Sequence, residues 1–241
     1  MLLSHHEQRA EHGFRLRGTS LSRLEVFSDV IFGLALALLV VSLKVPKDFS
    51  ELRVSVRGIV PFAVCFSLFS LLWHAHYQFF RRYAMQDRVT LALNSVLLFI
   101  VLFYVYPLKF LFGALLGEAN GGFAAQFHSG GGEIPELVLL YGVGFAASFL
   151  LIASMHVNAW RQREKLELSG TERLITMATV VDSVGIAGVG LFSCALGLLL
   201  PANYAADAGF AYILIAPWKL LTGIYFGRKV RLLEKLVEAP G

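Results

Sequence analysis

The chain has 241 residues, of which 56% are hydrophobic and only 16% are charged, and its mean hydropathy is positive. Soluble domains carry about a quarter charged residues, so this composition argues against a soluble enzyme and favours a membrane protein. The formal charge of +4 is modest and requires no nucleic-acid partner. It comes mainly from Lys and Arg between the apolar segments, as membrane insertion requires.

The N-terminal residues 1–21 are polar and lack the apolar core of a cleavable signal peptide. We therefore expect a cytoplasmic tail, with the first apolar segment acting as the insertion signal. That segment, 24–44, is apolar from Val30 to Leu43 apart from Ser42. Asp29 nevertheless lies in its first turns. A carboxylate at this depth is costly unless it faces protein or water, so it indicates a functional position.

Six apolar segments are each about 20 or more residues long, the length of a membrane-spanning helix. They lie at 24–44, 58–80, 90–112, 136–158, 174–200 and 205–227. The sequence thus predicts an all-α integral membrane protein, with a six-span domain at 22–229 and a cytoplasmic tail at 230–241. With the N-terminus inside, Lys and Arg on the inner side exceed those outside about threefold. Both termini are therefore expected in the cytoplasm, and the protein in the plasma (inner) membrane.

Residues suited to metal or redox chemistry form no recognisable site. His5, His6 and His12 lie in the N-terminal tail, where no fixed acidic or Cys ligand accompanies them, so we expect a tail without a metal. Cys65 and Cys194 both lie in apolar segments and are interpreted as small core residues, not as a disulfide.

Polar residues from three segments are predicted to share one depth. At a rise of about 1.5 Å per residue, Asp29, His76 and Asn94 each lie about 9–10 Å from the inner surface. Ser28 adjoins Asp29, and Trp73 lies one turn from His76. We interpret this layer as structural, because buried polar groups that satisfy one another hold membrane helices together. The alternative is direct proton or ion handling by Asp29 or His76.

These residues carry a resemblance to a known family. The pattern Arg-x-x-x-Phe-Ser-Asp at the start of the first segment resembles the signature of the transmembrane protein 175 potassium channels, in their short six-span prokaryotic form. It is formed here by Arg23, Phe27, Ser28 and Asp29. The second and third segments resemble the family through Trp73, His76, Phe80, Asp87, Asn94 and Pro107. The resemblance covers residues 22–110; elsewhere it rests mainly on hydropathy.

The resemblance implies a homotetramer in which the first helices line a central pore. It also implies that the Arg-Phe-Ser-Asp cluster, with the Trp, His and Asn behind it, holds those helices in place. The family's hydrophobic constriction lies seven residues after the signature Phe, which is Leu34 here. Helical spacing places Ala37 or Leu38, and then Val41, on the same face. A ring of Leu side chains can gate a pore by dewetting. Without the resemblance, Leu34 would be interpreted as a packing or lipid-facing residue.

One departure from the family pattern concerns selectivity. Family members commonly carry a Thr three residues after the constriction, where this chain has Ala37. An Ala ring widens the pore and offers no oxygen to a dehydrating cation, so we expect weakened selectivity for potassium.

Two further charges lie deep in the fifth and sixth segments. Asp182 and Lys219 are expected about 15 Å and 13 Å from the inner surface. Adjacent antiparallel helices would bring them to one level, and pairing is the least costly arrangement for both. We therefore predict a structural ion pair; the alternative is that Lys219 reaches the inner surface and leaves Asp182 to another partner.

The leading functional hypothesis is a cation channel that passes potassium, with the bilayer and copies of itself as partners. The alternatives are a proton-coupled secondary transporter that uses Asp29 and His76, or a non-conducting family member. A haem between His76 and His156 is less favoured. The sequence contains no arrangement typical of a hydrolase or metalloprotease, so we expect no enzyme and no cofactor beyond the permeant ions.

Overall fold

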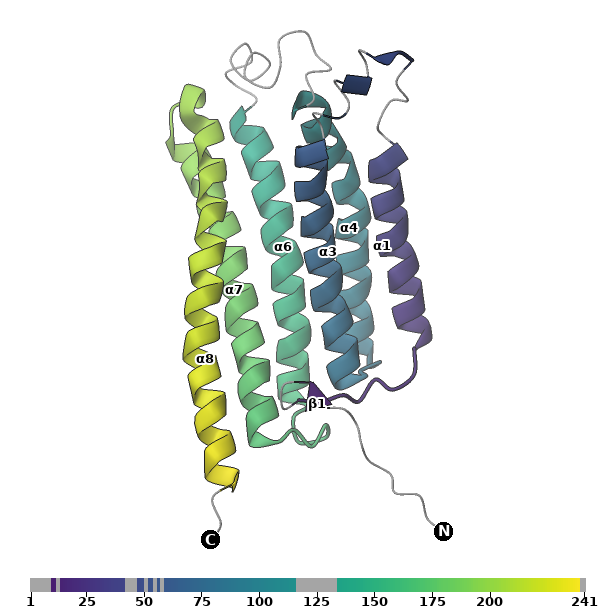
Figure 1. Cartoon of the computed structure of the whole chain (residues 1–241), viewed down its shortest axis with the longest axis vertical. Helices are drawn as coiled ribbons and strands as arrows, with labels where there is room; N and C mark the ends of the chain where they lie inside the picture. Colours follow the sequence, from purple (N-terminus) through teal and green to yellow (C-terminus); the bar gives the residue numbers. More distant parts are fainter. Residues whose placement is uncertain are drawn as a thin grey trace.

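The computed structural model describes residues 10–11, 14–41, 47–49, 52–53, 56, 59–115 and 134–238. The α-helices of these residues lie side by side along the long axis of the molecule (Figure 1). They are α1 (Arg23–Val41), α3 (Ile59–Tyr83), α4 (Arg88–Leu115), α6 (Ile134–Arg161), α7 (Gly170–Leu199) and α8 (Ile215–Glu238). A 3-10 helix, η1 (Ala202–Leu214), precedes α8. The predicted all-α class is confirmed.

Four of the described helical stretches are long and apolar enough to cross a membrane. They are Arg88–Leu108, Pro135–Arg161, Gly170–Leu199 and Asp207–Leu233. The helices α1 and α3 fall outside this set. In α1, Arg23, Glu25 and Asp29 crowd into the first turns of only 19 residues. The chain is therefore a multi-pass membrane protein.

The end of the chain differs from its predicted boundaries. The sixth apolar segment begins as η1, and α8 continues to Glu238, well beyond the expected end at 227. The stretch 228–238 contains neither Gly nor Pro and is rich in Arg, Lys, Leu and Glu, which are strong helix formers. The segment predicted as a C-terminal tail is therefore largely helical.

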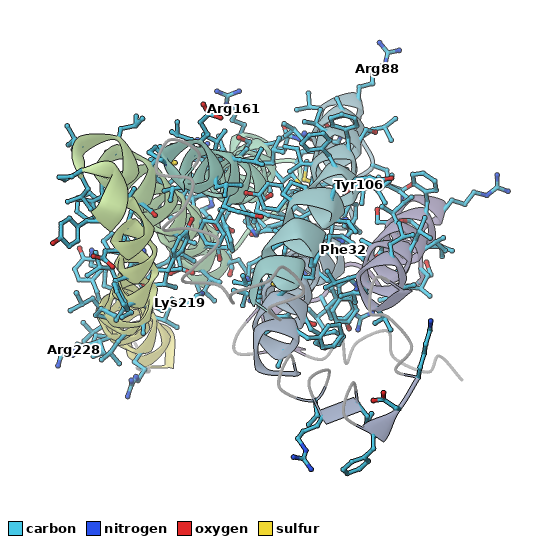
Figure 2. The ribbon with its side chains drawn as sticks, turned by 90° about the horizontal axis from the view of Figure 1, so that it is seen from above. Phe32, Arg88, Tyr106, Arg161, Lys219 and Arg228 are labelled. Atoms are coloured by element: carbon cyan, nitrogen blue, oxygen red, sulfur yellow. The ribbon has the colours of Figure 1, made fainter. Side chains whose placement is uncertain are left out.

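The main apolar core lies between α1, α3, α4 and α6. Its fully buried members include Phe32, Phe79, Leu97 and Ile152, one from each of these helices. Cys65 and Cys194 are buried free thiols, as predicted. The helices α1 and α8 lie at opposite edges of the bundle (Figure 2). Each of these two helices therefore has a face that the rest of the subunit does not cover.

A short N-terminal segment packs onto one end of the bundle. The strands β1 (Ala10–Glu11) and β2 (Phe14–Arg15) pair antiparallel beneath the helices (Figure 1). Phe14 is 1% exposed and meets the ring of Tyr83 edge-on at 5.4 Å. The backbone N–H of Gly18 donates to the carbonyl of Arg81 over 3.0 Å. Residues 14–18, named the N-terminal clasp below, are thus packed and do not form a free tail.

An ion pair anchors the clasp to the start of α7. Arg17 donates from Nη1 to Oε1 and from Nη2 to Oε2 of Glu172, over 3.0 and 2.9 Å. The backbone N–H of Arg15 also donates to Glu172 Oε1 over 3.0 Å. Glu172 in turn completes a capping box with Ser169, in which each side chain accepts from the other residue's backbone N–H. One buried carboxylate therefore starts a helix and binds the N-terminal segment.

Candidate functional site: a polar layer behind the first helix

A chain of hydrogen bonds joins α1, α4 and α3 inside the bundle. Asn94 Nδ2 donates to Ser28 Oγ over 3.0 Å, and Asn94 Oδ1 lies 2.8 Å from His76 Nε2. Ser28 Oγ in turn donates to the carbonyl of Leu24 over 2.8 Å. The side chains of Ser28, His76 and Asn94 are at most 1% exposed. These three residues, named the polar layer below, satisfy one another where each alone would be costly to bury.

Asp29 lies beside the polar layer and not within it. Its Oδ1 accepts from the indole Nε1 of Trp73 over 2.9 Å, and the residue is exposed in the isolated subunit. Asp29 was expected to pack against protein with Ser28, His76 and Asn94 in its neighbourhood, and its hydrogen-bond partner is Trp73. Residues at the same depth need not lie on the same face of a helix, because consecutive helical residues point about 100° apart. Ser28 points inward, so Asp29 does not.

The opposite face of α1 forms an exposed apolar stripe. Leu34 is 46% and Leu38 is 42% exposed, and Ala37 between them is also exposed. Towards the start of the helix, Phe27 continues the stripe at 57% exposure. Arg23 is exposed as well. The side chain of Val41, predicted to extend this face, lies outside the described residues.

A second polar contact fixes the start of α4 against α6. Asp87 accepts from Thr90 Oγ1 over 2.6 Å and from Asn158 Nδ2 over 3.1 Å. Partial burial acts to raise the pKa of Asp87, but these hydrogen bonds outweigh it and hold the pKa below its usual value. The family pattern indicated Asp87, whereas nothing in the sequence indicated Asn158. The hydrogen bonds of Asp87 with Thr90 and Asn158 lie at the same end of the bundle as the clasp.

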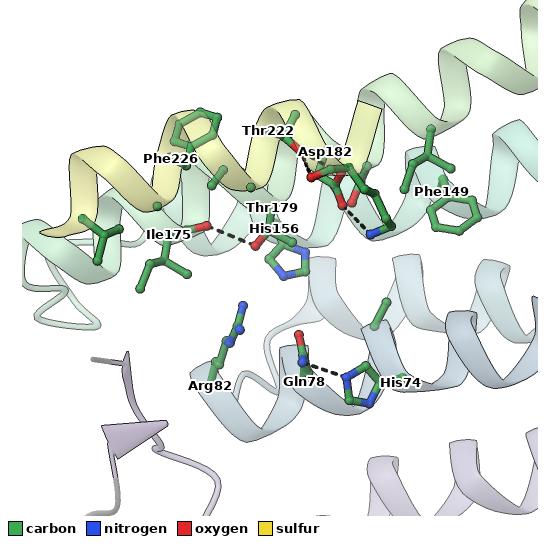
Figure 3. A pocket seen from close by; sticks show the side chains of 18 of the residues that line it. His74, Gln78, Arg82, Phe149, His156, Ile175, Thr179, Asp182, Thr222 and Phe226 are labelled. Atoms are coloured by element: carbon green, nitrogen blue, oxygen red, sulfur yellow. Dashed lines mark hydrogen bonds and ion pairs between the residues drawn. The ribbon is translucent and has the colours of Figure 1, made fainter. Parts of the chain in front are cut away.

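The structure brings Asp182 and Lys219 together across α7 and α8. Lys219 Nζ lies 2.8 Å from Asp182 Oδ2, and Thr222 Oγ1 donates to Asp182 Oδ1 over 3.3 Å (Figure 3). The side chain of Lys219 is 44% exposed and that of Asp182 is 23% exposed. Sequence reasoning missed Thr222, which lies one turn from Lys219 on α8 and could have been found by that spacing.

Reversing either charge of this pair is expected to destabilise the subunit. Asp182→Lys or Lys219→Asp leaves two like charges in apolar surroundings, which costs about 2.5 kcal/mol or more for each charge. The double variant restores a pair and should recover part of the thermal stability in detergent. Glu164→Lys, at a side chain that is 75% exposed, provides a control expected to change little. No recovery in the double variant would show that the contact contributes nothing.

No group of three or more His, Cys, Asp or Glu side chains is placed to hold a metal within the described residues. The three N-terminal histidines lie outside the described residues. His156 is 1% exposed and its Nδ1 donates to the carbonyl of Ile152 over 2.8 Å. His76 is engaged with Asn94.

This geometry defines a class of protein: a multi-pass helical membrane protein. A buried hydrogen bond at Ser28 ties its first helix to the bundle, and the outer face of that helix is apolar and exposed. The family model for the endosomal/lysosomal potassium channel TMEM175 matches residues 23–104, which include α1, α3 and most of α4. A potassium channel of Marivirga tractuosa is 36% identical over 229 residues, which are 90% of this chain and 92% of that protein. The chain belongs to the TMEM175 potassium channel family, as the resemblance predicted.

Solved structures agree with this assignment. A crystal structure of a variant of the potassium channel MtTMEM175, in complex with a nanobody–MBP fusion protein, matches with a TM-score of 0.74 at 34% identity. The match covers 89% of this chain and 97% of that one. A homologue, from Chamaesiphon minutus, of the lysosomal potassium-selective channel TMEM175 matches with a TM-score of 0.56 at 20% identity, over 83% of this chain and 96% of that one. The latter likeness shows a shared fold.

Proposed function

We propose that this protein is a potassium-permeable channel, assembled as a homotetramer around a pore lined by α1. The observation that carries this proposal is the two-faced character of α1. Its inner face is held by the polar layer, while its outer face presents Leu34, Ala37 and Leu38 away from the rest of the subunit. A relative at 36% identity is a potassium channel, which supports the same function here.

The proposal requires that α1 and α3 also cross the membrane, giving six spans. The 19 residues of α1 extend about 28 Å, close to the ~30 Å thickness of the hydrocarbon core. Arg15, Arg17 and Arg81 lie together at the clasp end of the bundle. By the positive-inside rule this end faces the cytoplasm, with the protein in the plasma membrane.

Leu34 is the proposed constriction. Four Leu side chains that meet on a fourfold axis form an apolar ring, which excludes water and thereby ions when narrow. Ala37 and Leu38, one turn further along the helix, would line the next level, followed by Val41. The alternative of a lipid-facing Leu34 predicts no effect on conduction, so mutation separates the two.

The polar layer is proposed to set the orientation of this pore helix. A coupled proton site in a transporter would favour direct contact between Asp29 and His76. Their hydrogen bonds instead go to Trp73 and Asn94, which supports the structural role. Asp29, on the exposed side of the layer, would then contribute to the contact between subunits.

The experiment that tests the proposal is recording of the purified protein in planar bilayers under opposed potassium and sodium gradients. A channel gives discrete single-channel steps whose reversal potential lies towards the potassium equilibrium value. A saturable, pH-coupled flux without such steps would instead favour the transporter. Silence of a well-folded tetramer would favour a non-conducting family member, and either result would overturn the proposal.

Replacing Ala37 by Thr is expected to increase the preference for potassium over sodium. Four hydroxyl groups at this level would replace part of the hydration that a potassium ion loses in the pore. The bi-ionic reversal potential should shift towards the potassium value. Ala37→Val is the matched control, because the Val side chain has nearly the same shape as Thr but lacks the hydroxyl group. Equal reversal potentials for both variants would remove Ala37 from the account of selectivity.

His76→Ala and Asp29→Ala are expected to weaken assembly more than they alter ion preference. Removal of the His76 ring leaves the amide of Asn94 with an unpaired buried acceptor, at a cost of about 1–3 kcal/mol. Light scattering in detergent should show fewer tetramers. Ser95→Ala, at an exposed neighbour of Asn94 on α4, is the control. Stable tetramers with altered permeation would favour a direct role in transport.

A further inference from the structure

The N-terminal clasp is connected to α1 by only four residues, 19–22. Both ends of this connection are hydrogen-bonded. At the clasp end, the backbone N–H of Thr19 donates to the carbonyl of Arg17 over 3.0 Å. At the helix end, the backbone N–H of Ser22 donates to Glu25 Oε2 over 2.8 Å, and that of Glu25 donates to Ser22 Oγ over 3.2 Å. This capping box fixes the start of α1 to the end of the connection, which therefore has little slack.

The clasp itself is fixed to α3 and α7 along its length. At its start, Phe14 is buried against Tyr83. At its end, Gly18 exchanges hydrogen bonds with Arg81: its N–H donates to the Arg81 carbonyl over 3.0 Å, and its own carbonyl accepts from Arg81 Nη1 over 2.6 Å. The ion pair with the start of α7 holds the part between them. The clasp is thus a fixed point to which the first turn of α1 is tied.

Gly18 lies unusually close to the backbone of α3. A Cβ atom added at Gly18 would be 2.7 Å from the carbonyl oxygen of Phe80 and 3.1 Å from Cα of Arg81. Both are backbone atoms of a helix, so they cannot move aside as the end of a flexible side chain could. A side chain at this position would therefore push the clasp away from α3, and docking requires Gly.

The clasp and the exposed stripe of α1 lie on opposite sides of that helix. The helix α1 lies at one edge of the bundle, and the clasp lies beneath the helices further inside it (Figure 1). Leu34, at 46% exposure, faces away from the rest of the subunit. The short connection therefore holds the first turn of α1 towards its own subunit and away from the side that carries Leu34.

We infer that the docked clasp keeps the clasp end of the pore open, because it holds the first turn of α1 in each subunit away from the fourfold axis. Release of the clasp lets the four helix starts approach the axis and narrow the pore, whereas the Leu34 ring further along sets the unitary conductance. Arg17, Gly18 and Glu172 are then positioning residues, which act on permeation through α1. This inference rests on the proposed function, since it needs a pore lined by α1.

Lengthening the connection tests the inference without disturbing the clasp. Four Gly residues inserted between Ser20 and Leu21 add up to about 13 Å of chain and leave every contact of the clasp in place. In planar bilayers the open probability should fall at least about fivefold, the lower end of the usual range for coupling between sites, at unchanged unitary conductance. Thr19→Ala/Ser20→Ala, at two exposed side chains, keeps the length and is the matched control. An unchanged open probability in the insertion variant would overturn the inference.

Undocking the clasp should have the same effect as lengthening the connection. Gly18→Ala is expected to lower the open probability as the insertion does, whereas Gly188→Ala, where an added Cβ meets nothing within 4 Å, should not. An equal open probability in Gly18→Ala and Gly188→Ala would contradict the inference.

Hydrogen exchange of the intact protein measures the position of α1 without conduction. Amides of residues 23–28 should exchange faster in both the insertion variant and Gly18→Ala, and those of residues 14–18 faster only in Gly18→Ala. Silence of the native protein in bilayers would overturn the proposed function. Unchanged exchange at the start of α1 in the insertion variant would overturn this inference, whether or not the protein conducts.

Discussion

Replacing Leu34 by Asn is expected to raise single-channel potassium conductance by about tenfold, which corresponds to about 1.4 kcal/mol taken from the barrier to permeation. The reason is the proposed apolar ring. Four amides would keep water in the constriction where four isobutyl groups expel it, so an ion would retain more of its hydration. Single-channel recording in symmetrical potassium solutions measures the change directly. Leu34→Ala should act in the same direction by widening the ring.

The control for Leu34 lies on the same helix. Val40 is 48% exposed but lies about 120° around the helix axis from Leu34, so Val40→Asn should leave conductance nearly unchanged.

The accessibility of position 34 to thiol reagents gives a second measurement. A Cys at position 34 should react with water-soluble thiol reagents that enter the pore, and the background is low because Cys65 and Cys194 are buried. Unchanged conductance together with an unreactive Cys would place Leu34 against lipid or protein.

The largest loss of stability is expected from Arg17→Met. Glu172 is 3% exposed, and the substitution leaves its carboxylate buried without the cation that contacts both of its oxygens. Breaking one side of a buried ion pair costs about 3–5 kcal/mol. Unfolding of the purified protein in mixed micelles with increasing SDS should therefore begin at a clearly lower SDS fraction.

A second substitution separates the ion pair from other effects of Arg17. In Arg17→Met/Glu172→Gln no charge remains buried, and Gln can still serve in the capping box with Ser169. The double variant should therefore be more stable than Arg17→Met alone. Glu164→Gln is the control and should have little effect, because this carboxylate, between α6 and α7, is 75% exposed. If Arg17→Met were as stable as the native chain, the clasp would contribute nothing to the fold.

Hydropathy and helical rise predicted the helices of the bundle and the depth at which its polar residues lie. Apolar segments of about 20 residues predict helices because the bilayer allows few alternatives. The rise per residue brought Ser28, His76 and Asn94 to one level, and Asp182 and Lys219 to another. It gives depth, however, and not the direction in which a side chain points. For that reason helical rise could not give the hydrogen-bond partner of Asp29, although Trp73 was recognised as a nearby donor.

Contacts between remote segments could not be predicted in this way. Arg17 and Glu172 are 155 residues apart, and no local pattern relates them. The pattern Ser169-x-x-Glu172 is a recognisable helix start, but it gives no sign that its carboxylate also binds a guanidinium. Asn158 belongs to the same class, because its contact with Asp87 depends on how α6 lies beside α4.

The clasp has a consequence for the order of events during synthesis. Its residues leave the ribosome before any of the helices, yet their anchor Glu172 follows Arg17 by 155 residues. At about 5–20 residues per second, the N-terminal segment waits about 8–30 seconds before its binding site exists. During that interval α1 has already been synthesised, but the clasp before it cannot yet contact Glu172. Docking of residues 14–18 is therefore a late step, which closes the subunit only after α7 has been inserted.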